Sequence, residues 1–325
     1  MNVQQQTVDL LGAPVTWAGV RGFNYLLRDG FTGLEQWQRF DQAVMRKDFE
    51  NALRHFPGIN AVRLWLSWDF HQADPAAFAE RFELALQIAE ENGLAVMPVL
   101  FNRWHAPVLD WGGVYLDHLI PHTSWVQTPS MWSDFIARAV GDHVDDPRIF
   151  LWDICNEPFA TLSPQAQIPP IALDAELNWL RSCAQLVKSI DPGTPTGISI
   201  HVEHGADGLS QIEPLVDVLL IHPYYDNRDG IIDSYRAISE AAGKPLLATE
   251  ACWGSHDDEV RVKRIHSNLA LLKNEQIGWL AYVMNHTDAA DGHREADGLL
   301  DTQGTLHFIE KDGSLRPGHD AFNLY

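Results

Sequence analysis

Eight short hydrophobic segments recur along the chain, separated by longer stretches in which apolar residues return with a helical period. Most of these segments are almost continuously apolar rather than alternating, which is typical of parallel strands buried on both faces. They occupy residues 17–23, 60–66, 95–101, 148–154, 196–202, 216–222, 245–251 and 277–284.

Amphipathic stretches of helical length lie between the hydrophobic segments, at residues 34–56, 74–93, 130–144, 174–190, 229–244 and 257–275. In the second of them, Asp74 is placed as an N-cap and Gly93 as a C-cap. A further helix expected between 203 and 215 is short and weakly patterned, and the polar tail is expected to end in a short closing helix. Strand and helix signals therefore alternate from one end of the chain to the other.

This alternation predicts an α/β fold, specifically a (β/α)8 TIM barrel. The alternative is an open doubly wound sheet, but residues 19–30 match its glycine-rich phosphate turn poorly. Because no linker or break in composition divides the chain, we expect a single domain over residues 1–325, with residues 7–20 as a small N-terminal hairpin that closes the barrel floor. Long connections near 102–128 and 158–173 follow strands, so they lie on the face where barrel enzymes carry their chemistry.

The composition of the chain limits the classes of binding partner and the cellular compartment that we expect. The 23 Lys and Arg against 44 Asp and Glu give a net charge of −21, which disfavours nucleic acid and anionic membranes as partners. No stretch approaches the ~20 apolar residues of a membrane span. The three cysteines form no CxxC pair, and the N-terminal residues lack the pattern of a signal peptide. We therefore expect a cytoplasmic protein, although a secreted protein whose leader had been removed would look the same.

The strongest chemical signal is the segment WDICNEP at 152–158, which ends the fourth predicted strand. Glu157 emerges there at an apolar strand end, where lost hydration favours the protonated form that a general acid needs. The neighbouring Asn156 can bond a substrate hydroxyl, and Pro158 prevents the strand from continuing.

A second carboxylate, Glu250, lies at the end of the seventh predicted strand, in PLLATEACWG at 245–254. Fourth and seventh strands stand on opposing sides of an eight-stranded barrel, so Glu157 and Glu250 can face each other across a ligand. Two such carboxylates about 5 Å apart carry out retaining glycoside hydrolysis, whereas a separation of about 6.5–9.5 Å gives inversion. Either residue alone is more often an ordinary strand-end carboxylate; the joint pattern is far more specific.

The chain resembles clan A retaining glycoside hydrolases, and most closely the glycoside hydrolase family 5 (cellulase-like) group. The resemblance spans nearly the whole chain, and the Asn-Glu-Pro motif with the second Glu is specific to the clan. It rests on residues 22–24 at strand one, Arg63 at strand two, residues 156–158 at strand four, His222 and Tyr224 at strand six, and Glu250 at strand seven.

The resemblance implies an enzyme that hydrolyses β-linked oligo- or polysaccharides, of glucan or mannan type, by double displacement and without a cofactor. Glu157 would be the acid/base and Glu250 the nucleophile, while Asn156 would bind the sugar 2-hydroxyl. Two alternatives stay open: a transglycosylase that uses the same intermediate, and a carbohydrate-binding barrel without turnover. In each case the partner is a carbohydrate, and the sequence leaves the oligomeric state open.

The resemblance also assigns supporting roles around Glu250. Arg63 would lie beneath the nucleophile, where its guanidinium keeps Glu250 ionised while Glu157 stays protonated. Tyr224 would donate a hydrogen bond to Glu250, and His222 would line the same pocket. A structural ion pair is the alternative for Arg63, and simple packing is the alternative for Tyr224.

Aromatic and histidine side chains near strand ends are candidates for contacting the sugar. His105, after the third strand, and Trp104 beside it are placed there, although Asn102 competes with His105 for the position. Enzymes of this kind usually present a Trp at the end of strand eight, but Trp279 comes too early in its strand, and Tyr282, Met284 or Asn285 stands at the expected end. We therefore expect Trp253, or another aromatic side chain, to supply a stacking surface.

A metal site is the remaining possibility, because the chain has 15 His. His201 and His204 flank Glu203 after the fifth strand, yet residues i and i+3 of a strand point to opposite faces. Neither an HExxH motif nor a Cys/His ligand spacing is present in the sequence. We expect no metal, and Glu203 ranks below Glu157 as a catalytic carboxylate.

Overall fold

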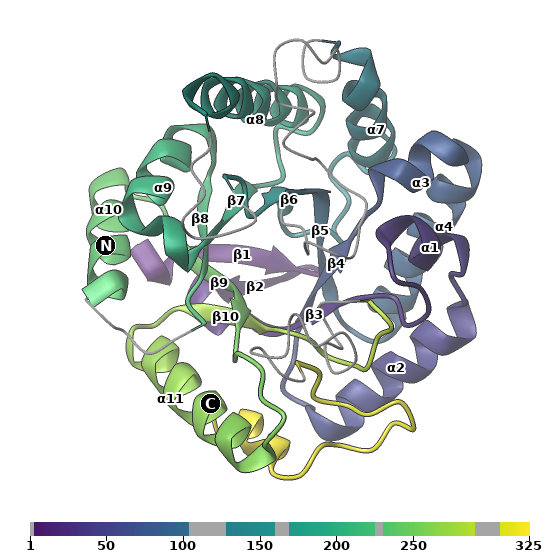
Figure 1. The fold of residues 1–325 in the computed structure, drawn as a ribbon, viewed down its shortest axis with the longest axis vertical. Helices are drawn as coiled ribbons and strands as arrows, with labels where there is room; N and C mark the ends of the chain where they lie inside the picture. Colours follow the sequence, from purple (N-terminus) through teal and green to yellow (C-terminus); the bar gives the residue numbers. More distant parts are fainter. Residues whose placement is uncertain (1–2, 104–127, 160–168, 225–229, 290–305) are drawn as a thin grey trace.

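Eight parallel strands form a closed barrel surrounded by helices (Figure 1). The computed structural model describes residues 3–103, 128–159, 169–224, 230–289 and 306–325. Each predicted hydrophobic segment contributes one strand, and the last strand pairs with the first, so the predicted (β/α)8 barrel is confirmed. The strands are β3 Arg21–Tyr25, β4 Ala61–Trp65, β5 Ala95–Asn102, β6 Trp152–Asn156, β7 Thr196–His201, β8 Val218–His222, β9 Leu246–Ala251 and β10 Gly278–Ala281.

Helices follow most of the strands and pack on the outside of the barrel (Figure 1). Within the described parts of the chain, none of them combines the length and the apolar character that crossing a bilayer requires. The α-helices are α1 Gly33–Gln38, α2 Gln42–His55, α3 Trp68–Ala73, α4 Pro75–Glu91, α7 Ser130–Gly141, α8 Pro170–Ile190, α9 Gly205–Ile212, α10 Ile231–Ala242 and α11 Asp258–Asn274. Short 3₁₀ helices are η1 Val3–Gln5, η2 Trp17–Gly19, η3 Val202–His204, η4 Glu213–Leu215 and the closing η6 His319–Leu324.

The helix boundaries show where local chemistry overrides the periodic pattern. Asp74 caps α4 as predicted, since its carboxylate accepts the Ala77 N–H, and Gly93 follows the helix with a φ of 68°. The single helix predicted over 34–56 is wrong, because the Asp41 carboxylate accepts two backbone N–H groups and starts α2 as a separate helix. The short helix α3, which begins after Ser67, was not predicted.

An N-terminal hairpin closes the floor of the barrel, as predicted. Strands β1 Thr7–Leu10 and β2 Ala13–Thr16 pair antiparallel and lie across the centre of the ring of strands (Figure 1). Val8, Leu10 and Trp17 pack in one cluster with barrel residues such as Ala61 and Leu247. The lower part of the barrel interior is therefore apolar and sealed.

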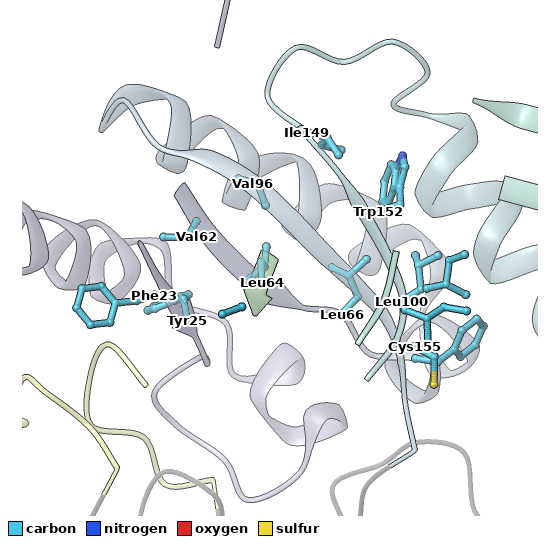
Figure 2. Close-up of a cluster of buried hydrophobic side chains, with 14 of the residues drawn as sticks. Phe23, Tyr25, Val62, Leu64, Leu66, Val96, Leu100, Ile149, Trp152 and Cys155 are labelled. Atoms are coloured by element: carbon cyan, nitrogen blue, oxygen red, sulfur yellow. The ribbon is translucent and has the colours of Figure 1, made fainter. Parts of the chain in front are cut away.

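Alternation along the strands separates an outer apolar layer from the barrel interior. Val62 and Leu64 of β4 belong to the large cluster between strands and helices, part of which Figure 2 shows. The residue between them, Arg63, faces inward and is completely buried. Because successive side chains of a strand point to opposite faces, polar residues at every second position can meet inside the barrel above its apolar floor.

Candidate active site

Glu157 and Glu250 meet at the upper end of the barrel. Glu157 directly follows β6, the fourth barrel strand, and Glu250 lies near the end of β9, the seventh. The two residues are 5% and 3% exposed. One carboxylate oxygen of each, together with a ring nitrogen of His222, lie within 4.8 Å of one another. The structure therefore brings together the two acids that the sequence placed on different strands.

Arg63 lies inside the barrel, beneath these two acids. Its Nη1 donates to Glu250 Oε1 at 2.5 Å, and its Nη2 donates to Asn156 Oδ1 at 2.8 Å. Asp153 Oδ2 accepts from Nε and Nη2 at 3.0 and 2.8 Å, and Asn24 Oδ1 accepts from Nη1 at 2.8 Å. One planar guanidinium therefore orients Glu250 and Asn156 at the same time.

The charge balance around Arg63 sets the protonation of Glu250. Burial raises the pKa of Glu250 well above its ordinary value, the Arg63 guanidinium opposes this, and Glu157 adds to it. Burial alone would lower the pKa of Arg63, but its ion pairs with Asp153 and Glu250 raise it instead. The single positive charge of Arg63 is shared between the buried carboxylates of Asp153 and Glu250. The ionisation of Glu250 therefore depends closely on the hydrogen-bond donors that face it.

Tyr224 supplies a further donor to Glu250. Its hydroxyl donates to Glu250 Oε2, on the side of the carboxylate away from the Arg63 contact at Oε1. Trp253 packs edge-on against Tyr224, with ring centroids 4.4 Å apart, and remains half-buried. The structure therefore places Tyr224 in direct contact with Glu250, and Trp253 beside Tyr224.

His222 links the two acids. Its Nδ1 lies 2.6 Å from Glu157 Oε1 and 3.7 Å from Glu250 Oε2. Burial lowers the pKa of His222 to about 4, although its hydrogen bond to Glu157 acts in the opposite direction. A neutral imidazole can accept a hydrogen bond from a protonated carboxyl or donate one to a carboxylate, according to its tautomer. The ring is therefore suited to a carboxyl group that gives up and regains a proton.

Asn156 is held by both its amide atoms. Its Oδ1 accepts from Arg63, and its Nδ2 donates to Asn102 Oδ1 at 3.0 Å. Among the described residues, the second hydrogen of Nδ2 has no acceptor, so it can be offered to a ligand hydroxyl. His105 and Trp104, the other candidates after β5, lie outside the described residues.

Tyr282 directly follows β10, the eighth barrel strand. The enzymes that this chain resembles usually carry a Trp at the end of that strand. Tyr282 is buried beside the half-buried Trp65, with ring centroids 6.5 Å apart. Trp279 is completely buried and covered by Arg21 at the opposite end of the barrel. Trp65 at the end of β4 packs in one cluster with three aromatic side chains that follow β8, β9 and β10, namely Tyr224, Trp253 and Tyr282.

Sequence reasoning missed Asp153 and Ser199, which complete the network under the acids. Ser199 Oγ donates to Asp153 Oδ2 at 2.6 Å. Asp153 and Asn156 would point to opposite faces of a regular strand, but the pairing of β6 with β7 shifts register between them. Both side chains therefore reach Arg63, and the period-two pattern carries no signal for this.

Two groups of side chains contain residue types that can bind a metal ion. Within the described residues, the trio of Glu157, His222 and Glu250 has ligand atoms that lie close enough together, and these atoms hydrogen-bond to one another, to Arg63 or to Tyr224. Glu203 is exposed, and its Oε2 lies 3.8 Å from His201 Nδ1 on the rim. Glu203 is therefore not part of the group around Arg63.

Comparison with known proteins finds both similar sequences and similar folds. A probable mannan endo-1,4-β-mannosidase A-1 of Aspergillus terreus is 26% identical over 215 residues, covering 57% of this chain and 52% of that protein. The exo-β-1,4-mannosidase of Opitutaceae bacterium strain TAV5 superposes with a TM-score of 0.72 at 16% identity, covering 99% of this chain and 60% of that one. The endo-1,4-β-mannanase of Rhizomucor miehei gives a TM-score of 0.67 at 18% identity, covering 96% and 93%.

These findings confirm the barrel fold and the resemblance to the family 5 group indicated by the sequence motifs. The chain spans about half the length of the curated relatives it matches. No family model matches the chain.

Proposed function

We propose that the chain is a retaining β-glycoside hydrolase that cleaves β-1,4-mannosidic bonds. The observation that carries the proposal is the approach of Glu157 and Glu250 to within 4.8 Å, measured between carboxylate oxygens. Carboxyl groups about 5–5.5 Å apart leave no room for the water that an inverting enzyme places between them. The separation therefore supports a covalent glycosyl-enzyme intermediate.

The reaction would proceed in two displacements. Glu250 attacks the anomeric carbon while Glu157 transfers its proton to the departing glycosidic oxygen. Glu157, now ionised, removes a proton from water, and the resulting hydroxide displaces Glu250 to release the sugar. Because His222 is neutral, it can stay hydrogen-bonded to Glu157 in both protonation states.

Arg63 and Tyr224 would keep Glu250 ionised and correctly turned. Both donate to its carboxylate, and hydrogen bonds to the charged form of an acid favour that form. Asn156, fixed by Arg63, would offer its free N–H to the sugar 2-hydroxyl, a contact that strengthens in the transition state.

Mannan is the substrate that the named activities of the relatives support, and glucan is the alternative. The test compares mannooligosaccharides with cellooligosaccharides of equal length and follows the anomeric form of the first product by NMR. We expect faster cleavage of the mannan series with β-anomer formed first. Formation of the α-anomer first would contradict the two-displacement mechanism. Sugar binding without turnover would favour a carbohydrate-binding barrel. Formation of longer oligosaccharides when an acceptor sugar is added would favour a transglycosylase.

Tyr224→Phe tests the donor to the proposed nucleophile. Removing a hydrogen bond to a charged group is expected to lower kcat/KM by about 10- to 100-fold. The ionised form of Glu250 loses a donor, so its pKa rises and the acidic limb of the kcat/KM profile moves to higher pH. The measurement is the pH profile on an aryl β-mannoside.

Tyr235→Phe is the matched control for this variant. Tyr235 is buried on α10, and its hydroxyl has no hydrogen-bond partner among the described residues. The same atom is removed there without touching the site, so kcat/KM and its pH profile are expected to stay unchanged. An unshifted acidic limb in Tyr224→Phe would show that this hydroxyl does not govern the ionisation of Glu250.

A further inference from the structure

The turn that presents Glu157 is held in an unfavourable backbone conformation. Glu157 has a φ of 48° and Phe159 a φ of 68°, on either side of Pro158. Left-handed conformations of residues other than glycine cost about 1–3 kcal/mol each and persist only where surrounding contacts enforce them. Contacts that fix this turn therefore also fix the direction of the Glu157 side chain.

Both left-handed residues have their backbone N–H groups tied to neighbouring elements. The Glu157 N–H donates to the Ser199 carbonyl of β7 at 2.9 Å. The Phe159 N–H donates to the side chain of Glu176 on α8, also at 2.9 Å. The Phe159 ring is buried and packs edge-on near His204. The second of these bonds is the notable one, because a buried side-chain carboxylate makes it.

Glu176 is completely buried and pairs with Arg103, which is 3% exposed. Their contact joins Arg103 Nε to Glu176 Oε1 at 3.2 Å. Burial raises the pKa of Glu176, while Arg103 and the Phe159 N–H oppose this. A buried ion pair is weak evidence for a stabilising role, since its desolvation offsets much of its attraction. The pair therefore calls for another explanation.

Arg103 also contacts the chain on the other side of Glu157. Its backbone N–H donates to the Asn156 carbonyl at 3.0 Å, directly before the turn. Its side chain reaches Glu176, which binds Phe159 directly after the turn. The pair thus connects the residues that precede and follow Glu157, and we call it the Arg103–Glu176 brace.

We propose that the Arg103–Glu176 brace is a positioning device that aims the Glu157 carboxyl at the glycosidic oxygen. The proposal rests on the proposed function, in which Glu157 is the general acid. General acid catalysis raises the reaction rate about 10²–10⁴-fold and requires that the acid lie within hydrogen-bond geometry of the leaving oxygen. If the turn relaxed, the enzyme would lose part of this rate enhancement. Neither Arg103 nor Glu176 needs to touch the substrate.

The experiment uses the dependence of the rate on the leaving group. A 2,4-dinitrophenyl β-mannoside loses its phenolate without protonation, whereas a mannooligosaccharide needs the acid. The parameter is kcat/KM, which reports steps up to cleavage of the glycosidic bond and excludes the later attack by water. Glu176→Ala is expected to lower kcat/KM on the oligosaccharide at least about 10-fold more than on the dinitrophenyl substrate.

The ratio of the two kcat/KM values separates positioning from folding. Partial misfolding lowers both values by the same factor, so it cancels in the ratio. Glu176→Gln keeps an acceptor for the Phe159 N–H and is expected to change the ratio less than Glu176→Ala. Arg103→Gln, made alongside, is expected to change the ratio in the same direction and decides the matter if Glu176→Ala is insoluble.

Asp191→Ala is the matched control. Asp191 is a buried carboxylate at the other end of α8, and it accepts from the indole of Trp152 at the start of β6. It joins the same helix to the same strand, far from the turn, so its loss is expected to lower stability without changing the ratio. Equal losses on both substrates in the Glu176 and Arg103 variants would overturn the proposal. A wild-type protein inactive on both substrates would instead contradict the proposed function.

Discussion

Replacing Glu250 by glycine is expected to lower kcat/KM on mannooligosaccharides by about 10⁴-fold or more, the scale on which catalytic nucleophiles act. The reason is that no other described carboxylate stands opposite Glu157 with Arg63 and Tyr224 donating to it. Glu250→Gln is the companion variant, since it keeps the shape of the side chain while replacing the nucleophilic carboxylate by a neutral amide. Thermal unfolding of both variants shows whether the barrel remains intact.

Azide assigns the roles of the two acids by stereochemistry. In Glu250→Gly, azide can enter the space left by the carboxylate and attack a dinitrophenyl β-mannoside from the face opposite the leaving group, which gives an α-mannosyl azide. In Glu157→Ala, azide attacks the covalent intermediate from the other face and gives the β-azide. A β-azide from Glu250→Gly, identified by NMR, would reverse the assignment.

Replacing Arg63 by methionine is expected to lower the free energy of unfolding by about 3–5 kcal/mol, because it leaves buried carboxylates without their cation. Asp153 and Glu250 both lose their partner, and Asn156 loses the donor that fixes its amide. Buried acids hold protons that the unfolded chain releases above about pH 4. The loss should therefore be larger at pH 7 than at pH 4 in denaturant titrations.

A double-mutant cycle isolates the ionic part of this effect. Asp153→Asn alone removes one partner of Arg63 and is expected to be destabilising. In the Arg63→Met background the same change removes an unpaired buried charge, so it is expected to restore part of the stability. If Asp153→Asn cost the same in both backgrounds, Arg63 and Asp153 would not be energetically coupled.

Strand positions in this protein could be predicted well because their signals are local. The eight apolar segments each became a barrel strand, since burial on both faces demands continuous hydrophobicity. The cap of α4 at Asp74 was predictable for the same reason, as a short polar side chain bonds N–H groups within one turn. The break between α1 and α2 was missed, because Asp41 lies inside a pattern that continues on both sides of it.

For the candidate site, the sequence and its family resemblance pointed to residues at strand ends and to the contacts of Arg63 and Tyr224 with Glu250, but not to the rest of the network. The two acids, Arg63, His222 and Tyr224 could be placed at strand ends, and the fold then brings them together. Asp153 could not be placed, because only the register shift beside β7 turns it toward Arg63. The Arg103–Glu176 brace joins a strand end to a helix 73 positions later in the sequence, and no spacing rule connects them.

The sequence by itself determined the order of strands and helices and the strand ends at which the acidic side chains stand, because period, capping and burial act over a few residues. Only the tertiary structure decided which atoms meet: the sharing of Arg63 between Asp153 and Glu250, and the left-handed turn at Glu157. Those contacts depend on the stagger of closed strands and on a local shift of register, and both arise only once the barrel has closed.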